Sequence, residues 1–173
     1  MSYFILSQDH RFVNAVKPLG VSEVVKPELL STDHAQELAA TNLHFTVAEA
    51  GQIDYVDYIE QPAPFVSDRL KRIVEKFAPD TLFVPGAFTD LTRRHQEVYW
   101  LIVPLRIDCL SVKSDFAPDG SLQRLVVDRA HTGGKMLLQV GGVRERILLM
   151  HLALAEALLR RDYNGIRLIR ADS

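Results

Sequence analysis

Residues 64–79, PFVSDRLKRIVEKFAP, carry the strongest secondary-structure signal in this chain and decide its fold class. The pattern predicts a helix over residues 64–78, in which Ser67 can serve as the N-cap and Pro79 ends the helix. Its apolar side chains recur at helical spacing and share one face, which consists of Val66, Leu70, Ile73, Val74 and Phe77. Because such a face must be buried against another element, we expect it to pack on a sheet that contains residues 99–103.

Segments with strand propensity lie on both sides of this helix. Strands are expected at residues 3–6, 45–48, 53–59, 81–84, 97–105, 122–127, 136–140 and 166–169. A second long helix is expected over residues 147–161, and a short one begins near Asp33, with Gln36 as its capping-box partner. Hairpin-like strands with two inserted helices predict a single α+β domain over residues 1–173. Its largely antiparallel sheet would carry two longer amphipathic helices.

Composition excludes several classes of protein. The 173 residues are 47% hydrophobic and 24% charged, which is typical of a folded soluble domain. The net charge of −2 argues against general nucleic-acid binding, and no apolar run predicts a signal peptide or a membrane span. The charge is uneven, because residues 1–60 hold three basic and nine acidic residues, a net charge of −6. Such asymmetry can mark an interaction face.

Motifs for a metal or a nucleotide are incomplete. Gly133-Gly134-Lys135 resembles a phosphate loop, but Arg129 stands where the pattern needs its first glycine and Met136 where it needs serine or threonine. None of the six histidines is paired with another at the spacing of metal ligands. We therefore expect a tight turn at residues 131–135, and neither a metal nor a cofactor.

Two residues invite a catalytic interpretation. His95 lies in a polar stretch with Asp90 and Arg93, and a dispersed enzyme or nucleotide site built from these three residues is the alternative functional hypothesis. Cys109, the single cysteine, lies in an apolar stretch and is expected to be a buried core residue. One cysteine allows no internal disulfide and is consistent with the reducing cytoplasm.

The most unusual segment is residues 49–60, EAGQIDYVDYIE, with four acidic residues, no basic residue and two tyrosines. Tyrosines are enriched at protein interfaces, and an acidic face attracts a basic partner. The segment predicts a partner-binding surface made of Asp54, Tyr55, Asp57, Tyr58 and Glu60. The competing interpretation is an edge strand whose charges discourage aggregation.

Several short motifs resemble immunity family eleven of bacterial polymorphic-toxin loci. They are YFIL at residues 3–6, FVSDRLK at 65–71, VYWL at 98–101, IDCL at 107–110 with Ser114, and YNGIRL at 163–168. The resemblance implies a cytoplasmic, non-enzymatic protein that binds and neutralises a cognate protein toxin and has no catalytic residues. We expect no nucleic-acid or membrane partner, and a homodimer stays open.

Overall fold

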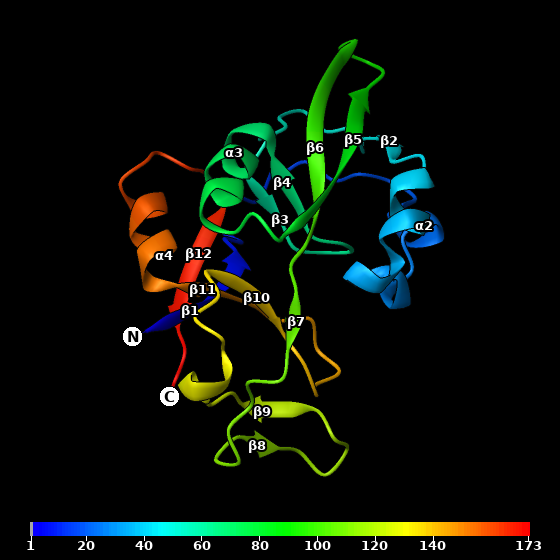
Figure 1. Cartoon of the computed structure of the whole chain (residues 1–173). Helices are drawn as coiled ribbons and strands as arrows, with labels where there is room; N and C mark the ends of the chain where they lie inside the picture. The colour runs from blue at the N-terminus through cyan, green and yellow to red at the C-terminus, as the bar shows by residue number, and fades with distance from the viewer. Residues whose placement is uncertain (1) are drawn as a thin grey trace.

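The computed structural model describes residues 2–173, which form two five-stranded sheets and a two-stranded ribbon (Figure 1). Sheet I has the order β12 (Ile166–Arg170), β1 (Tyr3–Gln8), β11 (Leu148–His151), β10 (Leu137–Val140) and β7 (Arg106–Ile107). Sheet II has the order β2 (His44–Thr46), β5 (Leu82–Asp90), β6 (His95–Val103), β4 (Phe65–Ser67) and β3 (Tyr58–Ile59). The ribbon pairs β8 (Asp115–Phe116) with β9 (Leu122–Arg124).

The expected α+β class is confirmed, but the chain builds two sheets where the sequence predicted one. Most strand pairs are antiparallel, and each five-stranded sheet also contains one parallel pair, β7 with β10 in sheet I and β2 with β5 in sheet II. The helices are α1 (Val21–Val24), α2 (Ala35–Ala40), α3 (Asp68–Phe77) and α4 (Leu152–Leu159), with short 3-10 turns at Pro27–Leu29, Thr32–His34 and Arg129–His131. None of these helices has the length and apolarity to cross a membrane.

Helix α3 has the predicted core face but a later start. Residues 65–67 form strand β4, where Phe65 pairs with Leu101, so the helix begins only at Asp68. Ser67 is the expected N-cap, and its hydroxyl accepts the amide of Leu70 at 3.2 Å. Leu70, Ile73 and Val74 are buried, Val66 is buried from the strand, and Phe77 is half-buried. The helix packs on β6 as predicted.

The predicted helix over residues 147–161 was wrong in its first part. Residues 148–151 form β11, which pairs with β1 and β10, and only residues 152–159 form α4. All four residues of β11 are buried, so the strand is apolar on both faces and shows no alternation that would distinguish it from a helix. The short helix near Asp33 also begins differently, because a 3-10 turn precedes α2 and no side chain caps it.

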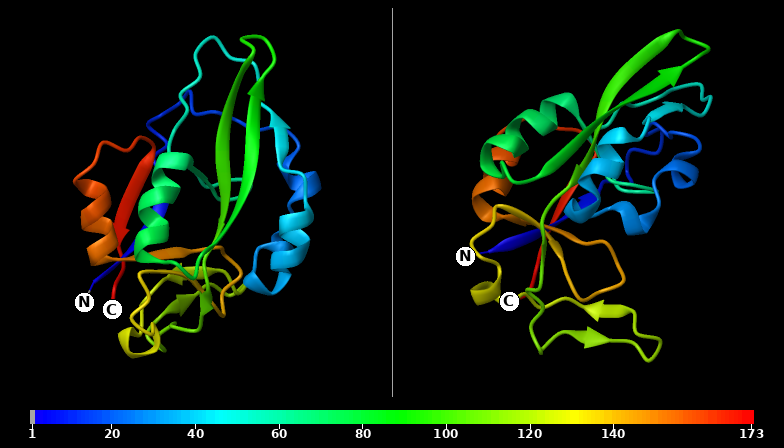
Figure 2. Two further views of the ribbon diagram at one scale, coloured as in Figure 1. Left: turned by 45° about the horizontal axis from the view of Figure 1, so that its top comes forward. Right: turned by 45° about the vertical axis from the view of Figure 1, so that its right-hand side comes forward.

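Three apolar clusters hold these layers together. Figure 2 shows the layers from two further directions. One face of sheet II packs against the N-terminal segment with α1 and α2, through Phe45, Phe65, Phe88, Tyr99 and Leu101. Its other face meets α3, which lies beside α4 over sheet I, through Val66, Ile102, Leu70, Val74, Met150 and Leu154. The far face of sheet I packs against the loops around the ribbon, through Tyr3, Cys109, Val127, Leu138 and Leu149. The end of the β5–β6 hairpin projects beyond all three layers (Figures 1 and 2).

Candidate functional site

The acidic segment at residues 49–60 is mostly loop. Of the strand predicted over residues 53–59, only Tyr58 and Ile59 form a strand, the edge strand β3, and Asp54 forms an isolated bridge with Ala15. Asp54 lies in a loop that is held by main-chain bonds, since its amide donates to the carbonyl of Asn14 at 2.8 Å and its carbonyl accepts the amide of Val16 at 2.9 Å. The five predicted contact residues therefore do not share one strand face.

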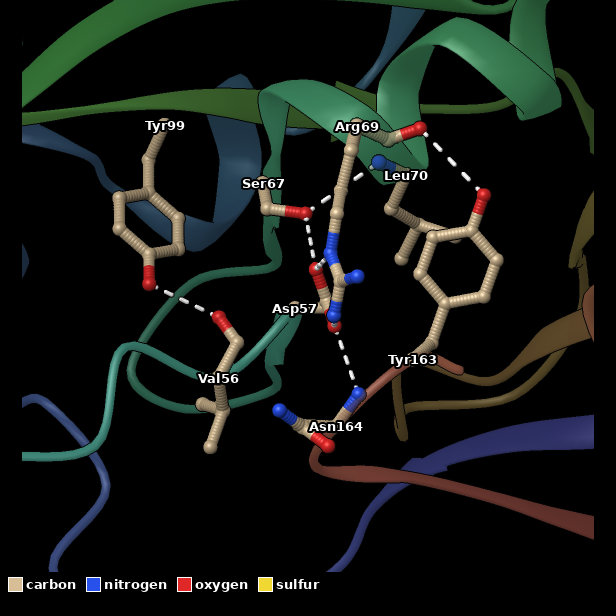
Figure 3. Close-up of polar contacts among 8 residues, drawn as sticks. All are labelled: Val56, Asp57, Ser67, Arg69, Leu70, Tyr99, Tyr163 and Asn164. Carbon is tan, nitrogen blue, oxygen red and sulfur yellow. Dashed lines mark hydrogen bonds and ion pairs between the residues drawn. The ribbon is translucent and has the colours of Figure 1, made fainter. Parts of the chain in front are cut away.

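Asp57 is a buried structural carboxylate, with 2% of its surface exposed (Figure 3). Arg69 donates to it from Nε at 2.7 Å and from Nη2 at 2.5 Å, and the Ser67 hydroxyl donates at 2.6 Å. The amide of Asn164 donates to Oδ2 at 2.6 Å. The carboxylate thus joins three parts of the chain, namely the loop before β3, the N-terminus of α3 and the turn before β12. We refer to this arrangement as the Asp57 hub.

Tyr58 is likewise interior, with 1% of its surface exposed, and burial raises its pKa above the usual range. The prediction that Asp57 and Tyr58 lie on an accessible surface is therefore wrong. The physical reason is that both sit where the two sheets meet, so Tyr58 joins the cluster of α3 and α4. Glu60 is half-buried beside Arg146, which donates to its carbonyl oxygen, and burial raises the pKa of the Glu60 carboxyl.

Tyr55 and Asp54 remain partly accessible and lie toward the β5–β6 hairpin. The Tyr55 ring meets the ring of His95 edge-on, with centroids 5.1 Å apart. The Tyr55 hydroxyl is buried without a hydrogen-bond partner in the described chain, and burial raises its pKa. This contact fixes the loop against the base of the hairpin tip, which we define as residues 90–95.

The side chains of Asp90 and Arg93 come together as supports of the hairpin tip, whereas the His95 side chain bonds elsewhere. The Asp90 carboxylate accepts the amides of Thr92 and Arg93 at 3.0 and 3.1 Å and the Arg93 guanidinium at 2.8 Å. Hydrogen bonds from Arg93 hold the pKa of the Asp90 carboxyl below its usual range. His95 instead bonds to Glu97 at 2.8 Å and lies on the strand surface, half exposed. Asp90 and Arg93 are thus occupied in holding the turn, and His95 is bonded to Glu97.

Further bonds fix the tip to the loop before β3. Arg93 Nη2 donates to the carbonyl oxygens of Ala50 and Gly51 at 2.7 and 3.0 Å. Thr92 donates its hydroxyl proton to Glu49 at 2.6 Å. Leu91 is 70% exposed, and the residues on either side of it, Asp90 and Thr92, are both held by hydrogen bonds. The tip is therefore a projection held by several hydrogen bonds, with an apolar side chain at its end.

Three adjoining hollows run from this tip across the N-terminal segment. The hollow at the tip is about 340 Å³ and is lined by Glu49, Ala50, Gly51, Thr92 and Arg93. The next, about 190 Å³, shares Glu49 and Ala50 with it and continues along residues 13–17. The third, which we call the Val13 hollow, is about 640 Å³ and is lined by Gln8, His10, Phe12, Val13, Ala15, Val16, Lys17, Pro18, Ile59, Gln61 and Pro62. Neighbouring hollows share lining residues, and we refer to the three hollows together as the groove.

The other residues whose side chains could carry chemistry have structural roles. Cys109 is buried as predicted, and burial raises the pKa of its thiol. Gly133 and Gly134 both adopt positive φ in the expected turn, and Lys135 pairs with Asp80 at 2.6 Å. Within residues 2–173, no three His, Cys, Asp or Glu side chains are grouped so as to hold a metal ion.

The groove was not predicted from the sequence, except for the neighbourhood of Asp54. Its long wall, residues 10–18, has neither periodicity nor a motif. The one available signal was the apolar Val13, which lies in a stretch without strand or helix pattern and is 77% exposed. A groove wall built from loops leaves little trace in a single sequence, because only main-chain bonds fix its shape.

Comparison with protein-family models and with curated protein sequences gave no match to this chain.

Proposed function

We propose that this chain is a non-enzymatic immunity protein, which binds a bacterial toxin in the cytosol and neutralises it. The observation that carries the proposal is the hairpin tip, a projection held by hydrogen bonds that carries an exposed leucine and borders the hollow lined by Glu49, Ala50 and Gly51. The resemblance of residues 65–71, 98–101 and 163–168 to immunity family eleven supports the same function.

A rigid projection suits protein binding for an energetic reason. Binding costs free energy whenever side chains or loops must be ordered, and a surface that is already ordered avoids this cost. The bonds of Asp90, Arg93 and Thr92 order the tip before a partner arrives. Leu91 can then enter a pocket of the partner, and burial of such a side chain contributes about 1.5–3 kcal/mol.

The charges around the tip are mixed. Glu49 and Asp54 lie on one side, Arg94 is exposed on the turn itself, and Arg93 is half exposed. The uniformly acidic face that the sequence predicted is therefore replaced by a surface of both signs. We infer that recognition depends on individual complementary contacts more than on a general attraction to a basic toxin.

A matched pair of substitutions tests the proposal against the toxin encoded beside this gene. Leu91→Asp changes the tip, whereas Leu159→Asp changes an equally exposed leucine, at 74%, on the distant helix α4 (Figure 1). We expect Leu91→Asp to weaken toxin binding in calorimetry by about 30-fold or more, as for a hot-spot residue, and to abolish protection in co-expression. Leu159→Asp should leave both unchanged.

The result that contradicts the proposal is equally definite. Folded wild-type protein that does not bind the neighbouring toxin, or that leaves its activity unaffected at saturating concentration, would exclude an immunity function. Equal affinity of the Leu91→Asp and wild-type proteins would instead exclude the tip as the binding element. Circular dichroism of each variant establishes that the fold is retained.

A further inference from the structure

We propose that the outer edge of strand β12 binds an extended segment of another protein, which carries two acidic residues three positions apart. The segment would add a strand to sheet I, where β12 is the last strand (Figure 1). In this mode of recognition main-chain hydrogen bonds supply affinity and side chains supply specificity. The inference is independent of the proposed immunity function, because the hairpin tip belongs to sheet II.

The register of β12 shows which of its main-chain groups point outward. The amide of Asp9 donates to the carbonyl of Gly165 and the amide of Ala171 to the carbonyl of Tyr3, both at 2.9 Å. Residues that exchange hydrogen bonds with the partner strand alternate with residues that do not, and the antiparallel register with β1 is regular throughout β12. Residues 165, 167, 169 and 171 therefore face β1. Residues 166, 168 and 170 direct their amide and carbonyl groups away from it.

These outward groups lie in an opening between two covered ends. No hydrogen bond from another described residue reaches the amide or carbonyl groups of residues 166, 168 and 170. At one end the amide of Asp57 donates to the carbonyl of Asn164 at 2.8 Å, and at the other the amide of Val127 donates to the carbonyl of Asp172 at 2.8 Å. The opening therefore spans the five residues of β12 and fits a segment of similar length.

The other edges of the two five-stranded sheets are shorter or covered. Strands β3 and β7 have two residues each, and β2, with three, receives the amide of Leu19 at the carbonyl of Thr46. Strand β12 contains no proline, glycine or bulge, which are common means of protecting an edge. Its protection consists of two exposed arginines, Arg167 and Arg170, which disfavour an added strand that lacks acidic residues.

The positive charge of these arginines is not compensated within the described chain. Neither forms an ion pair there, although two carboxylates lie near them. Asp9 interacts with Arg167 but is bound by Arg11 at 2.7 Å. Asp172, two residues beyond Arg170, is bound by Arg124 at 3.1 Å. The charged residues at and before the Asn164 end are three basic and two acidic, namely Arg69, Arg160, Arg161, Asp57 and Asp162.

The positions of the arginines define the acidic pattern of the partner. Arg167 and Arg170 are three positions apart, so the residues directly opposite them on an antiparallel strand are also three positions apart. Opposite charges at such cross-strand positions stabilise the pair. Between them Ile169 is 39% exposed and would contact an apolar residue of the segment.

A second copy of β12 is too long for this opening. In the symmetric register centred on Leu168, residue 172 of the copy would lie opposite Asn164, where Asp57 already binds. Registers shifted by two residues in either direction bring the same collision closer to the centre, at Asn164 or at Asp172. Four arginines would also meet along the shared edge. The occupant is therefore a segment of a different protein.

A strand tethered to the C-terminus tests this proposal. The sequence Glu-Val-Thr-Glu-Val is joined to Ser173 of the full chain through a Gly/Ser linker of about ten residues, which spans roughly 16–19 Å. Antiparallel pairing then places the two glutamates opposite Arg170 and Arg167. The matched control carries Lys-Val-Thr-Lys-Val on the same linker. Such a tether holds the segment at a millimolar effective concentration, so that weak pairing is detected.

Amide hydrogen exchange is measured residue by residue by NMR. In the untethered chain the amides of residues 167 and 169 should exchange slowly, and those of residues 166, 168 and 170 rapidly. The glutamate tether should slow exchange at residues 166, 168 and 170 by about tenfold or more and leave residues 167 and 169 unchanged. The lysine tether should change none of the five. In the Arg167→Glu/Arg170→Glu protein the two tethers should exchange their effects.

The contrary outcomes are specific. Slow exchange at residues 166, 168 and 170 in the untethered chain would show that the edge is already covered, and slow exchange only at high protein concentration would show that a second copy binds. Either result overturns the proposal, as does a glutamate tether without effect. Equal protection by both tethers overturns the selection of acidic segments. Toxin binding is measured separately, so none of these results decides the immunity function.

Discussion

Replacement of Asp57 by asparagine should destabilise the fold strongly, although the two side chains have the same shape. Asp57 accepts four hydrogen bonds, two from Arg69 and one each from Ser67 and the amide of Asn164. Asparagine retains one acceptor oxygen and turns the other into a donor. The new NH2 group would face N–H or O–H groups that now donate to the second carboxylate oxygen. At least one of these buried donors would then lose its acceptor.

The magnitude follows from the exposure of each partner. Removal of one partner of a fully buried ion pair costs about 3–5 kcal/mol, because a buried charge remains uncompensated. The Arg69 side chain is 54% exposed, so water can hydrate it when it is released, and the cost falls toward the lower end. We expect the free energy of unfolding to fall by about 3 kcal/mol. For a chain of this length the Tm then decreases by about 6–12 °C.

Urea and thermal unfolding of Asp57→Asn, followed by circular dichroism, measure this loss. Arg72→Ala is the control, because it removes an ion pair of similar length on the same helix, at 2.8 Å, whose side chains are 72% and 41% exposed. Its cost should be at most about 1 kcal/mol. A Tm for Asp57→Asn within about 2 °C of the parent chain would refute the conclusion that the Asp57 hub stabilises the fold.

Three further predictions follow from the backbone, from an ion pair and from the buried thiol. Gly165→Ala should lower the free energy of unfolding by about 2–5 kcal/mol in urea denaturation, since the residue has φ +78° and a Cβ would lie 2.6 Å from the Cβ of Val56; a loss below about 1 kcal/mol would contradict it. Arg11 lowers the pKa of the Asp9 carboxyl from 3.8 to about 2, so the folded state gains stability from this pair above pH 3.8 and loses it as the pH falls toward 2. The stability difference between the parent and Arg11→Ala should therefore shrink over that interval, and a difference that widened on acidification would contradict this. Cys109 is buried and the pKa of its thiol is raised, so it should react with a thiol reagent only after unfolding; rapid labelling of native protein would show that it is accessible.

The Asp57 prediction also separates two roles that the sequence could not distinguish. If the Asp57 carboxylate bound the partner, its replacement would lower toxin affinity with little change in Tm. Because it is the centre of the Asp57 hub, its replacement should instead lower the Tm with little change in toxin affinity. The same acidic residue types serve both purposes, and burial alone decides between them. Here residues 54 and 55 lie near the groove, whereas residues 57 and 58 belong to the interior.

The sequence by itself determined the local features of this protein. The apolar stripe of residues 70–77, the Ser67 cap and Pro79 specify a helix wherever the rest of the chain lies, because periodicity and capping act over a single turn. The β-branched and aromatic run of residues 98–103 likewise specified strand β6. The glycine turn at residues 133–134 followed from the conformational freedom of its residues.

Only the tertiary structure decided which residues are accessible and how the apolar runs are divided. Residues 148–151 became a strand because β1 and β10 lie on either side of them, a long-range pairing that no local pattern encodes. Asp57 is buried because Ser67, Arg69 and Asn164, which are 10, 12 and 107 residues away in sequence, converge on its carboxylate. The groove exists because separate loops meet along residues 10–18. Burial and concavity are properties of packing between distant segments, and for that reason the site came from the fold and not from the sequence.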